Sequence, residues 1–312
     1  MTDRGKIVVT GGTGYLGQTL VRRLAARGNE VVVLSRSGGM PPELAEVTGV
    51  RVMAWDPMNV DAGDLSSALD GAQAVVHLAG RKAVGERYTK RVKREILESR
   101  VKSTETLVTA WRRVRRRAPV FVCASGVGYF GGRSGEHAPL DESAPPGQDF
   151  LARVCVEWEE SARAAERFGV RVVSTRFGAV LGRGDGPLAV MAKPFKFMVG
   201  GPIGAGRQIF SWVHLEDAIS ALELAIDDAR VTGPVNVVAP DAVSSTEVAK
   251  AIGRALHKPS WLRAPEFALR LLFGEGAEPL VTGQRAVPAK LEALHFRFRY
   301  PTLDEALAEA FA

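Results

Sequence analysis

The feature that most constrains this chain is a glycine-rich turn directly after its first apolar run. The run 6–10 (KIVVT) leads without interruption into residues 11–17 (GGTGYLG). In a turn of this kind the first glycine permits a tight bend, the second lets a pyrophosphate approach the backbone, and the third allows the following helix to pack on the strand. The phosphate oxygens can then bind free N–H groups at the start of that helix. We therefore expect this turn to bind a dinucleotide through Gly11, Thr13, Gly14, Tyr15, Leu16 and Gly17.

Short runs of β-branched residues alternate with helical patterns beyond this turn. The runs are almost continuously apolar, which is typical of strands in a parallel sheet that is covered on both faces. They occupy residues 6–10, 30–36, 50–55, 74–80, 119–125 and 170–176, and helical patterns occupy residues 15–27, 92–115 and 150–168. This alternation predicts right-handed βαβ units, and hence an α/β fold with a Rossmann-type, doubly wound parallel sheet.

The local composition of the sequence changes after residue 178, where glycine and proline become frequent. The later patterns predict a helix at 187–198, a strand–helix unit at 209–228, a strand at 234–238 and a helix at 245–256. No linker is long enough to separate independent domains. We predict an NADP-binding core formed by residues 1–178 with 208–240, and a smaller C-terminal α/β lobe on the substrate side, formed by residues 179–207 and 241–312.

The composition excludes several classes of protein. Of the 312 residues, 46% are hydrophobic and 24% are charged, which is ordinary for a globular protein. No apolar run approaches the roughly 20 residues of a membrane helix, and the first residues lack the apolar stretch of a signal peptide. The two cysteines, Cys123 and Cys155, provide neither a disulfide framework nor a zinc site. We therefore expect a cytoplasmic protein with no metal ion and no membrane partner.

Positive charge is concentrated in one segment. The chain has 41 Lys and Arg against 35 Asp and Glu, a net charge of +6, but residues 81–117 alone carry 14 basic residues against four glutamates. Part of this charge, above all Arg81, Lys82 and Arg100, could attract an anionic cofactor or substrate. The arginines at 112–117 could bind nucleic acid, but they also fit a solvated helix end, where basic residues complement the negative terminus. We adopt the second interpretation and expect no nucleic-acid partner.

The end of the second expected strand indicates which dinucleotide is bound. A site that prefers NAD usually has an acidic residue there to hold the ribose hydroxyls, whereas this chain has Ser35 and Arg36. A hydroxyl and a guanidinium suit a 2′-phosphate, so the sequence favours NADP(H). The alternative is that Arg36 is an ordinary solvated loop arginine.

Two further strand ends could line the cofactor. Asp56 follows the third expected strand and could accept a hydrogen bond from an adenine amino group. Leu78, Ala79 and Gly80 close the fourth expected strand beside His77. Both segments could equally be ordinary turns.

Four motifs of this chain resemble those of a known family. They are TGGTGYLG (10–17), HLAG (77–80), SGVGYFG (125–131) and TRFGAVLGRG (175–184). With them the chain resembles the extended short-chain dehydrogenase/reductases, a group that includes nucleotide-sugar epimerases and dehydratases. It is most similar to an atypical, epimerase-like subgroup with a C-terminal domain of unknown function.

The resemblance to this subgroup extends over essentially the full length. Its further matches are Ser99-Arg100-Val101 with Thr104, Asp149-Phe150-Leu151, Trp158-Glu159, residues 202–208 (PIGAGRQ), residues 211–214 (SWVH) with Asp217, Gly274-Glu275, and residues 283–285 (GQR) with Pro288. Two positions depart from the subgroup, which tends to have Met where this chain has Gly276 and Gly where it has His295.

The resemblance also implies a catalytic pair that this chain lacks. In the family, a tyrosine stands four residues before a lysine on the helix after the fifth strand, and an upstream serine positions the substrate. Residues 149–159 contain no such pair, because Leu151 stands at the tyrosine position and Cys155 at the lysine position. Arg100 stands where relatives outside the subgroup have an asparagine.

A rebuilt catalytic site is one interpretation of the residues that remain. Ser125, Tyr129 and Arg100 could orient and polarise a substrate near the nicotinamide. The alternative is that Ser125 and Tyr129 only preserve the cofactor pocket. Cys155 is a second candidate, either as a reactive thiol beside positive charge or as a buried cysteine without a chemical role.

Substrate contacts are expected from the smaller lobe. The resemblance favours Arg207 and Gln208, because related epimerases use an arginine near this position to bind a substrate phosphate; the alternative is a solvated arginine. The resemblance also implies that His214 lies at a structural junction. Arg285 could be a second anion contact or a salt-bridge partner.

Two functions follow from these expectations. The first is an NADP(H)-dependent oxidoreductase or epimerase-like enzyme that acts on an unidentified small molecule. The second is a non-catalytic NADP(H)-binding sensor or interaction protein, favoured by the missing pair. Related enzymes often form homodimers through the helices at 92–115 and 150–168, although the arginine cluster weighs against that arrangement here.

Overall fold

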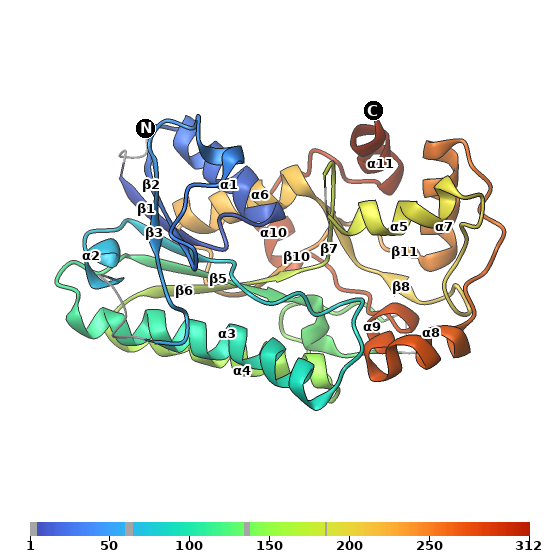
Figure 1. Cartoon of the computed structure of the whole chain (residues 1–312), viewed down its shortest axis with the longest axis horizontal. Coiled ribbons are helices and arrows are strands. Elements are labelled where there is room, and N and C mark those ends of the chain that lie inside the picture. Colours follow the sequence, from blue (N-terminus) through green and yellow to red (C-terminus); the bar gives the residue numbers. More distant parts are fainter. Residues whose placement is uncertain (1–4, 60–64, 134–137, 185) are drawn as a thin grey trace.

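A seven-stranded parallel sheet forms the centre of the molecule (Figure 1). The computed structural model describes residues 5–59, 65–133, 138–184 and 186–312. The strand order is β10-β6-β5-β4-β1-β2-β3, so the chain runs outward in one direction from β1 and in the other from β4. The strands are β1 (Lys6–Thr10), β2 (Glu30–Ser35), β3 (Val50–Ala54), β4 (Ala74–His77), β5 (Val120–Gly126), β6 (Arg171–Phe177) and β10 (Gly233–Val237). The predicted Rossmann-type, doubly wound α/β fold is confirmed.

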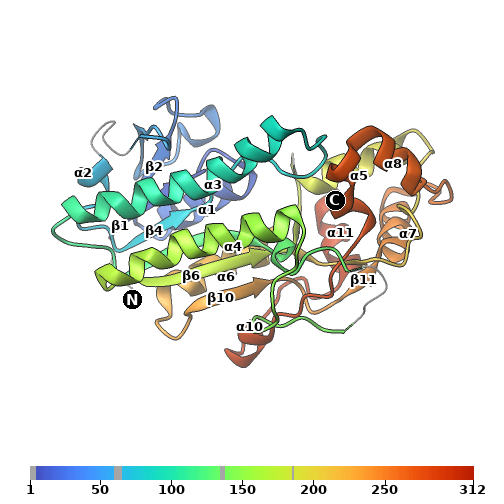
Figure 2. The same ribbon diagram turned by 90° about the horizontal axis from the view of Figure 1, so that it is seen from below.

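Helices cover both faces of this sheet. On one face lie α1 (Tyr15–Ala26) and α6 (Leu215–Asp227), and on the other lie α2 (Leu65–Leu69), α3 (Lys90–Ala110) and α4 (Phe150–Arg163) (Figures 1 and 2). Successive strand residues point to opposite faces, so Val9 packs with the α1 and α6 side and Val8 with the α3 and α4 side. Because the strands other than β3 are buried on both faces, the apolar runs of the sequence coincide closely with the strands. The edge strand β3 is only half-buried, with Arg51 and Ala54 exposed.

A smaller lobe lies beyond the carboxyl ends of the strands (Figure 1). It contains two small sheets, one pairing β7 (Ala179–Leu181) with β9 (Trp212–His214) and the other pairing β8 (Ile209–Phe210) with β11 (Val243–Ser244). Its helices are α5 (Pro187–Lys196), α7 (Ser245–Leu256), α8 (Glu266–Phe273), α9 (Glu278–Val281) and α11 (Leu303–Phe311). Leu188, Trp212, Ile252 and Leu307 form the centre of a separate apolar core. The lobe therefore has its own packing and faces the edge at which the parallel strands end.

One part of the C-terminal segment returns to the large sheet. The helix α10 (Ala289–Ala293) places the fully buried Leu291 in the core beneath β10, and Phe296 and Phe298 pack against the same core. Asp217 on α6 anchors the following residues, because its carboxylate accepts hydrogen bonds from the backbone N–H groups of Arg299 (2.7 Å) and Tyr300 (3.0 Å). The division of the chain into core and lobe stays a prediction, and this stretch of the predicted lobe packs on the core.

Two helices end earlier than their sequence patterns. The pattern at 92–115 predicts a helix to residue 115, but α3 ends at Ala110 and continues only as a 3-10 turn through Arg113. The N–H groups of Arg115 and Arg116 donate instead to the Asp70 carboxylate, at 3.1 and 2.8 Å. Similarly, α4 ends at Arg163 and a 3-10 turn follows to Phe168. Throughout the ranges described above, no helix is both long and apolar enough to cross a lipid bilayer.

Candidate nucleotide and substrate site

The glycine turn has the backbone geometry that the sequence predicts. Gly11 has a φ of +69°, and a Cβ atom there would lie 2.8 Å from the backbone nitrogen of Ala79. A Cβ atom on Gly17 would lie only 2.1 Å from the carbonyl oxygen of Gly11. Because both contacts are with backbone that cannot move aside, larger residues are excluded at both positions. The turn brings β1, the segment after β4 and the start of α1 into direct contact.

The start of α1 is open to a ligand. Gly14 is the N-cap residue, so it offers no side chain to the first N–H groups of the helix. Its own N–H donates to the Gly11 carbonyl at 3.0 Å, which closes the turn. Thr13 and Gly14 are exposed, and Leu16 packs towards the core. Uncapped N–H groups and the helix dipole at this end favour a phosphate.

Tyr15 links the glycine turn to the smaller lobe. A Cβ atom on Gly186 would lie 2.6 Å from Cζ of the tyrosine ring, so this glycine leaves room for the ring. The hydroxyl is buried and forms no hydrogen bond with any residue that the structure describes. Burial, reinforced by the negative charge of Glu309, raises the pKa of Tyr15 to about 12. Tyr15 is therefore a neutral contact between α1 and the segment before α5.

The ends of β1, β2 and β4 lie side by side. Thr10 is paired with Leu34 on one side and with His77 on the other, so the residues that follow these strands share one edge of the sheet. Arg36 is exposed there, and among the described residues it has no hydrogen-bond or ion-pair partner. Ser35 is half-buried next to it. The structure thus brings Ser35 and Arg36 to the same edge as the glycine turn.

Asp56 has the contacts of an ordinary turn. Its Oδ1 atom accepts a hydrogen bond from the backbone N–H of Met58, at 2.9 Å. The side chain is exposed, two residues beyond the end of β3, where Ala54 is paired with Ser35 of β2. This hydrogen bond favours the interpretation of Asp56 as an ordinary turn residue. The second carboxylate oxygen could still accept a hydrogen bond from an adenine amino group.

A chain of buried hydrogen bonds lies behind the edge of the sheet at which β1, β2 and β4 end. We call this edge the cofactor edge. His77 Nδ1 lies 2.6 Å from the Thr10 hydroxyl, and Nε2 lies 3.1 Å from the Ser103 hydroxyl. Ser103 donates to the carbonyl of Ser99 at 2.7 Å, so its oxygen can accept from Nε2–H while Nδ1 accepts from Thr10. The Thr10 oxygen in turn accepts from the N–H of Ala79, at 3.3 Å. Burial, with a smaller contribution from Arg100, lowers the pKa of His77 to about 3, so the imidazole is neutral.

Ser125 belongs to a buried ionic network. Its hydroxyl donates to Glu159 Oε1 at 2.7 Å, and the Arg176 guanidinium donates to both oxygens of Glu159 at 2.8 Å. The centre of the Tyr129 ring lies 3.3 Å from Cζ of Arg176. Burial alone would lower the pKa of Arg176, but the hydrogen bonds to Glu159 raise it. The buried charges are therefore matched, and Tyr129 covers the guanidinium.

Cys155 lies next to this network. A Cβ atom on Gly128 would lie 3.8 Å from Cys155 Sγ and 3.5 Å from Leu151 Cβ, so both residues of α4 face the segment after β5. Burial, followed by the negative charge of Glu159, raises the pKa of Cys155 to about 11. A thiol with this pKa is protonated near neutral pH, which favours the interpretation of Cys155 as a buried cysteine.

Glu159 and Arg176 are the residues that sequence reasoning missed. Arg176 stands at the end of an apolar strand, and Glu159 lies one helical turn after Cys155 on the buried face of α4. A buried arginine requires a partner, and the acidic residue on the facing helix is the signal that could have found it. The structure brings Ser125, Tyr129 and Cys155 together with this pair. We call these five residues the Ser125 cluster.

Arg100 lies between this cluster and the cofactor edge. A Cβ atom on Gly80 would lie 3.3 Å from Cζ of Arg100, so the guanidinium touches the backbone that follows β4. Its Nη1 atom donates to the Ile96 carbonyl at 3.0 Å, and the guanidinium lies 5.0 Å from the centre of the Trp158 ring. Arg100 thus connects the segment 78–80 with α4.

The predicted substrate contacts in the lobe differ from each other. The Gln208 amide nitrogen donates to the carbonyls of Ile203 (3.0 Å) and Leu280 (3.2 Å), so both of its donors are used within the lobe. Arg207 is exposed, and no described residue bonds to it. The expectation of a substrate contact therefore rests on Arg207 rather than on the Gln208 donors.

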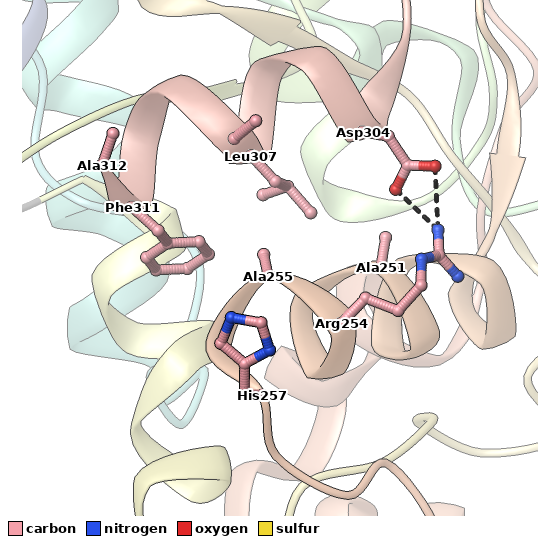
Figure 3. A pocket seen from close by; sticks show the side chains of 9 residues that line it. Ala251, Arg254, Ala255, His257, Asp304, Leu307, Phe311 and Ala312 are labelled. Atoms are coloured by element: carbon pink, nitrogen blue, oxygen red, sulfur yellow. Dashed lines mark hydrogen bonds and ion pairs between the residues drawn. The ribbon is translucent and has the colours of Figure 1, made fainter.

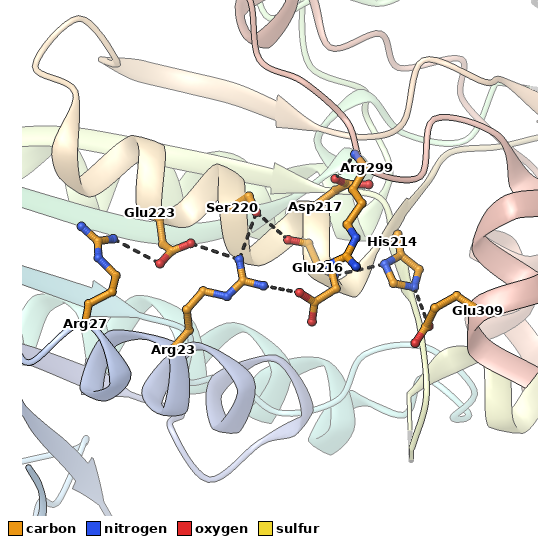
Figure 4. Close-up of polar contacts among 9 residues, drawn as sticks. All are labelled: Arg23, Arg27, His214, Glu216, Asp217, Ser220, Glu223, Arg299 and Glu309. Atoms are coloured by element: carbon orange, nitrogen blue, oxygen red, sulfur yellow. Dashed lines mark hydrogen bonds and ion pairs between the residues drawn. The ribbon is translucent and has the colours of Figure 1, made fainter. Parts of the chain in front are cut away.

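His214 is a junction between the two parts of the molecule (Figure 4). Its Nδ1 atom accepts from the Glu216 N–H at 3.2 Å, and Nε2 lies 3.0 Å from Glu309 on α11. Glu216 also pairs with Arg23 on α1. Burial lowers the pKa of His214, despite the nearby carboxylates. The histidine therefore links α6 to α11, as expected from the resemblance, and has no free ring nitrogen.

The basic segment is largely bound within the molecule. Arg81 pairs with Glu86 at 2.7 Å and with Glu95 at 3.2 Å. Arg117 donates to the Trp111 carbonyl at 3.1 Å, at the end of the α3 region. These contacts are those of a solvated helix end and a paired loop.

A pocket lies between α7 and α11, apart from the strand ends (Figure 3). It has a volume of about 410 Å³, and the Arg254–Asp304 ion pair (2.6 Å) closes one side. None of the residues lining it belongs to the glycine turn or to the Ser125 cluster. Within the described ranges no group of three or more His, Cys, Asp or Glu side chains could hold a metal ion.

The parallel strand order and the glycine turn define a Rossmann-fold protein with a nucleotide-binding edge. The model of the NAD dependent epimerase/dehydratase family matches residues 7–238, and a domain of unknown function (DUF1731) matches residues 264–310. The chain therefore belongs to the NAD dependent epimerase/dehydratase family.

The relatives extend over nearly the whole chain. The chloroplastic "Epimerase family protein SDR39U1 homolog" of Arabidopsis thaliana is 36% identical, over 96% of this chain and 85% of that protein. "Epimerase family protein YfhF" of Bacillus subtilis is also 36% identical, over 98% of each chain. The crystal structure of the human epimerase family protein SDR39U1 (isoform 2) with NADPH superposes with a TM-score of 0.85, at 31% identity over 98% of this chain and 99% of that one. The resemblance to extended short-chain dehydrogenase/reductases is thus confirmed.

Proposed function

We propose that this chain is an NADP(H)-dependent oxidoreductase or epimerase-like enzyme that acts on a small molecule. The observation that carries this proposal is the exposed Arg36, which has no partner among the described residues and lies at the same edge as the open glycine turn. A guanidinium at this position suits the 2′-phosphate that distinguishes NADP from NAD. The human relative that was crystallised with NADPH supports the same assignment.

The residues of the edge fit such a cofactor. Gly11 and Gly17 allow β1, the segment after β4 and the start of α1 to pack in direct contact, and the uncapped start of α1 offers N–H groups to the diphosphate. Ser35 and Arg36 would hold the adenosine end, and residues 78–80 would lie along the nicotinamide half. When bound, the cofactor supplies or accepts hydride.

Substrate chemistry is assigned to the groups beside residues 78–80. Arg100 would orient the substrate, with Ser125 and Tyr129 at the neighbouring strand end. The Ser125 hydroxyl already donates to Glu159, so it would present its lone pairs to a substrate rather than its proton. Arg207 would contribute a contact from the lobe. The cytoplasmic location and a homodimer through α3 and α4 stay predictions.

The test combines binding with turnover. NADPH and NADH are titrated by fluorescence, and NADPH consumption is then followed by absorbance with a panel of aldehydes and ketones. We expect NADPH to bind more tightly than NADH and at least one carbonyl compound to be reduced. A variant with Gly17→Ala serves as the control for cofactor-dependent turnover, because its Cβ atom would collide with the Gly11 carbonyl.

A non-catalytic NADP(H)-binding protein is the second candidate. It is favoured by Leu151 and Cys155 at the positions of the family's tyrosine and lysine, and by the engagement of Ser125 with a buried ion pair. Tight NADPH binding without hydride transfer to any member of the panel, or from any member of a matching alcohol panel to NADP⁺, would favour this candidate.

A further inference from the structure

Arg100 differs from Arg176 and Arg81, two other arginines with partly or fully buried side chains. It is half-buried on α3, and its one protein acceptor among the described residues is the Ile96 carbonyl of its own helix. Arg176, by contrast, forms a two-pronged ion pair with Glu159. Arg81 is paired with two glutamates. In the described part of the chain, no carboxylate lies within ion-pair distance of Arg100.

A guanidinium in this environment is incompletely satisfied. Removing a charge from water without an opposite charge is unfavourable, and burial accordingly lowers the pKa of Arg100 from its ordinary value. The Trp158 ring at 5.0 Å gives partial compensation through its electron-rich face. One backbone carbonyl uses only one of the five N–H groups of the guanidinium. The remaining N–H groups can therefore bind an anion that the protein itself does not supply.

The position of Arg100 limits where that anion lies. The guanidinium touches Gly80, which follows β4 and whose missing side chain leaves its surface open. The Arg81 N–H donates to the Ser99 hydroxyl at 3.0 Å, and this bond fixes the backbone next to Gly80. On its α4 side, Cζ of Arg100 lies 5.0 Å from the centre of the Trp158 ring, on the same helix as Cys155. The anion would thus lie between residues 78–80 and the Ser125 cluster.

We infer that Arg100 binds a carboxylate group of the substrate, so that the substrate of this site is a small carboxylic acid. This inference rests on the proposed function, because it places the acid beside the cofactor. A planar guanidinium can hold both oxygens of a carboxylate. A phosphate could be held in the same way. The diphosphate of the cofactor, however, has its place at the glycine turn and the start of α1, and a substrate phosphate is expected at Arg207 in the lobe. The exposed basic residues nearby, including Lys82, favour the approach of a negatively charged molecule.

The experiment uses two probes of the same shape. Isobutyrate carries a carboxylate, isobutyramide is its uncharged counterpart, and neither has a ketone or aldehyde that could be reduced. Each is titrated into the full chain saturated with NADP⁺, and binding is measured by thermal shift and by ligand-observed NMR. We expect isobutyrate to bind at least tenfold more tightly than isobutyramide. Equal binding of the two, or no binding of isobutyrate, would overturn the inference.

Variants then assign this preference to Arg100. We expect Arg100→Gln to weaken isobutyrate binding at least tenfold while the Kd for NADPH changes less than about twofold. Arg112→Gln is the matched control, because it removes the same charge from an exposed position of the same basic segment and should retain both affinities. If Arg100→Gln retains isobutyrate binding, or loses NADPH binding instead, the carboxylate assignment is wrong.

A second variant covers the case in which Arg100→Gln does not fold. Arg100→Lys keeps the charge but removes the two-pronged geometry, and we expect several-fold weaker isobutyrate binding with unchanged NADPH binding. The outcome is separable from that of the proposed function. Carboxylate binding without hydride transfer would leave the inference in place, whereas reduction of uncharged compounds without carboxylate preference would support only the proposed function.

Discussion

Two neighbouring regions of the same sheet edge are built in opposite ways. At the ends of β1, β2 and β4, the glycine turn, the uncapped start of α1 and Arg36 leave polar groups available. At the end of β5, Ser125 is bound to Glu159, and Glu159 is bound to Arg176. The first region can recognise a ligand mainly through its backbone, while the second has turned its polar side chains towards each other. Cofactor binding by the first region therefore does not depend on free polar side chains in the second.

We expect the largest change in stability from a substitution in the second region, at the end of β5. Glu159→Gln removes the charge that balances Arg176 but retains the shape of the side chain. Leaving a buried charge without its partner costs about 3–5 kcal/mol, and we expect the free energy of unfolding to fall by about the lower of these values. Urea denaturation measures the change. Glu160→Gln, on the exposed side of the same helix, is the control and should change stability by less than about 0.5 kcal/mol.

A small effect of Glu159→Gln would break the comparison between the two regions. It would mean that the Ser125 end of the sheet is as accessible to water as the cofactor edge. The same measurement with NADPH present sharpens the comparison, because the added stabilisation by the cofactor should be similar in the parent chain and the variant.

In the first region, the contribution of the buried His77 to stability should depend on pH. His77 has an ordinary pKa near 6.5 in the unfolded chain and a pKa of about 3 in the folded one. Below pH 6.5 the unfolded chain binds a proton that the folded chain does not, so stability falls as the pH falls. The loss is about 1.4 kcal/mol per pH unit, or about 2 kcal/mol between pH 6.5 and pH 5. Urea denaturation at several pH values should show this slope, and His77→Gln should reduce it.

The control for this pH dependence is His257→Asn. His257 is exposed and has a φ of +53°, a conformation that asparagine tolerates. Its replacement should leave the slope unchanged. The interpretation of His77 as a neutral, buried support would be wrong if His77→Gln and the parent chain lost stability in parallel.

Reversing the charge at Arg36 in the first region should change the preference for NADPH over NADH. Arg36→Glu places a negative charge where the 2′-phosphate is expected, and we predict NADPH binding to weaken by about tenfold or more, since a charge-assisted hydrogen bond contributes about 1.5–3 kcal/mol. NADH binding, which involves no 2′-phosphate, is the internal control. Fluorescence titration of both nucleotides measures the ratio. An unchanged ratio would identify Arg36 as a solvated loop arginine.

The smallest expected effect concerns Ser125 itself. Ser125→Ala removes one hydrogen bond to Glu159 and should lower the free energy of unfolding by about 1 kcal/mol. If the serine also contacts substrate, the turnover rate should fall together with stability, whereas Tyr129→Phe would change the rate with little change in stability. Unchanged rates in both variants would leave Ser125 and Tyr129 as structural neighbours of the cofactor pocket.

The elements that depend on residues close together in the chain can be predicted from the sequence. The strands other than β3 could be predicted because both of their faces are buried, and the glycine turn because its motif occupies seven consecutive residues. The five-residue helix α2 was missed because a segment this short has too few positions to show a helical period.

The contacts of the site between distant residues could not be predicted in the same way. The Arg176 and Glu159 side chains meet across a strand and a helix, so neither residue indicates its partner by its neighbours. Gln208 donates to the carbonyl of Leu280, 72 residues further along the chain. Its motif suggested a ligand contact, whereas the structure assigns both donors to packing within the lobe.

The return of α10 to the large sheet has a consequence for how such chains are inherited. Residues 264–310 match a separate family model, yet Leu291, Phe296 and Phe298 from this stretch complete the core beneath β10. A recombination event that exchanged only the tail would have to supply matching apolar side chains at the same time. The two sequence units are therefore expected to pass from one protein to another as a pair, and a fragment that stopped before residue 264 would expose the part of the core beside β10 that these side chains cover.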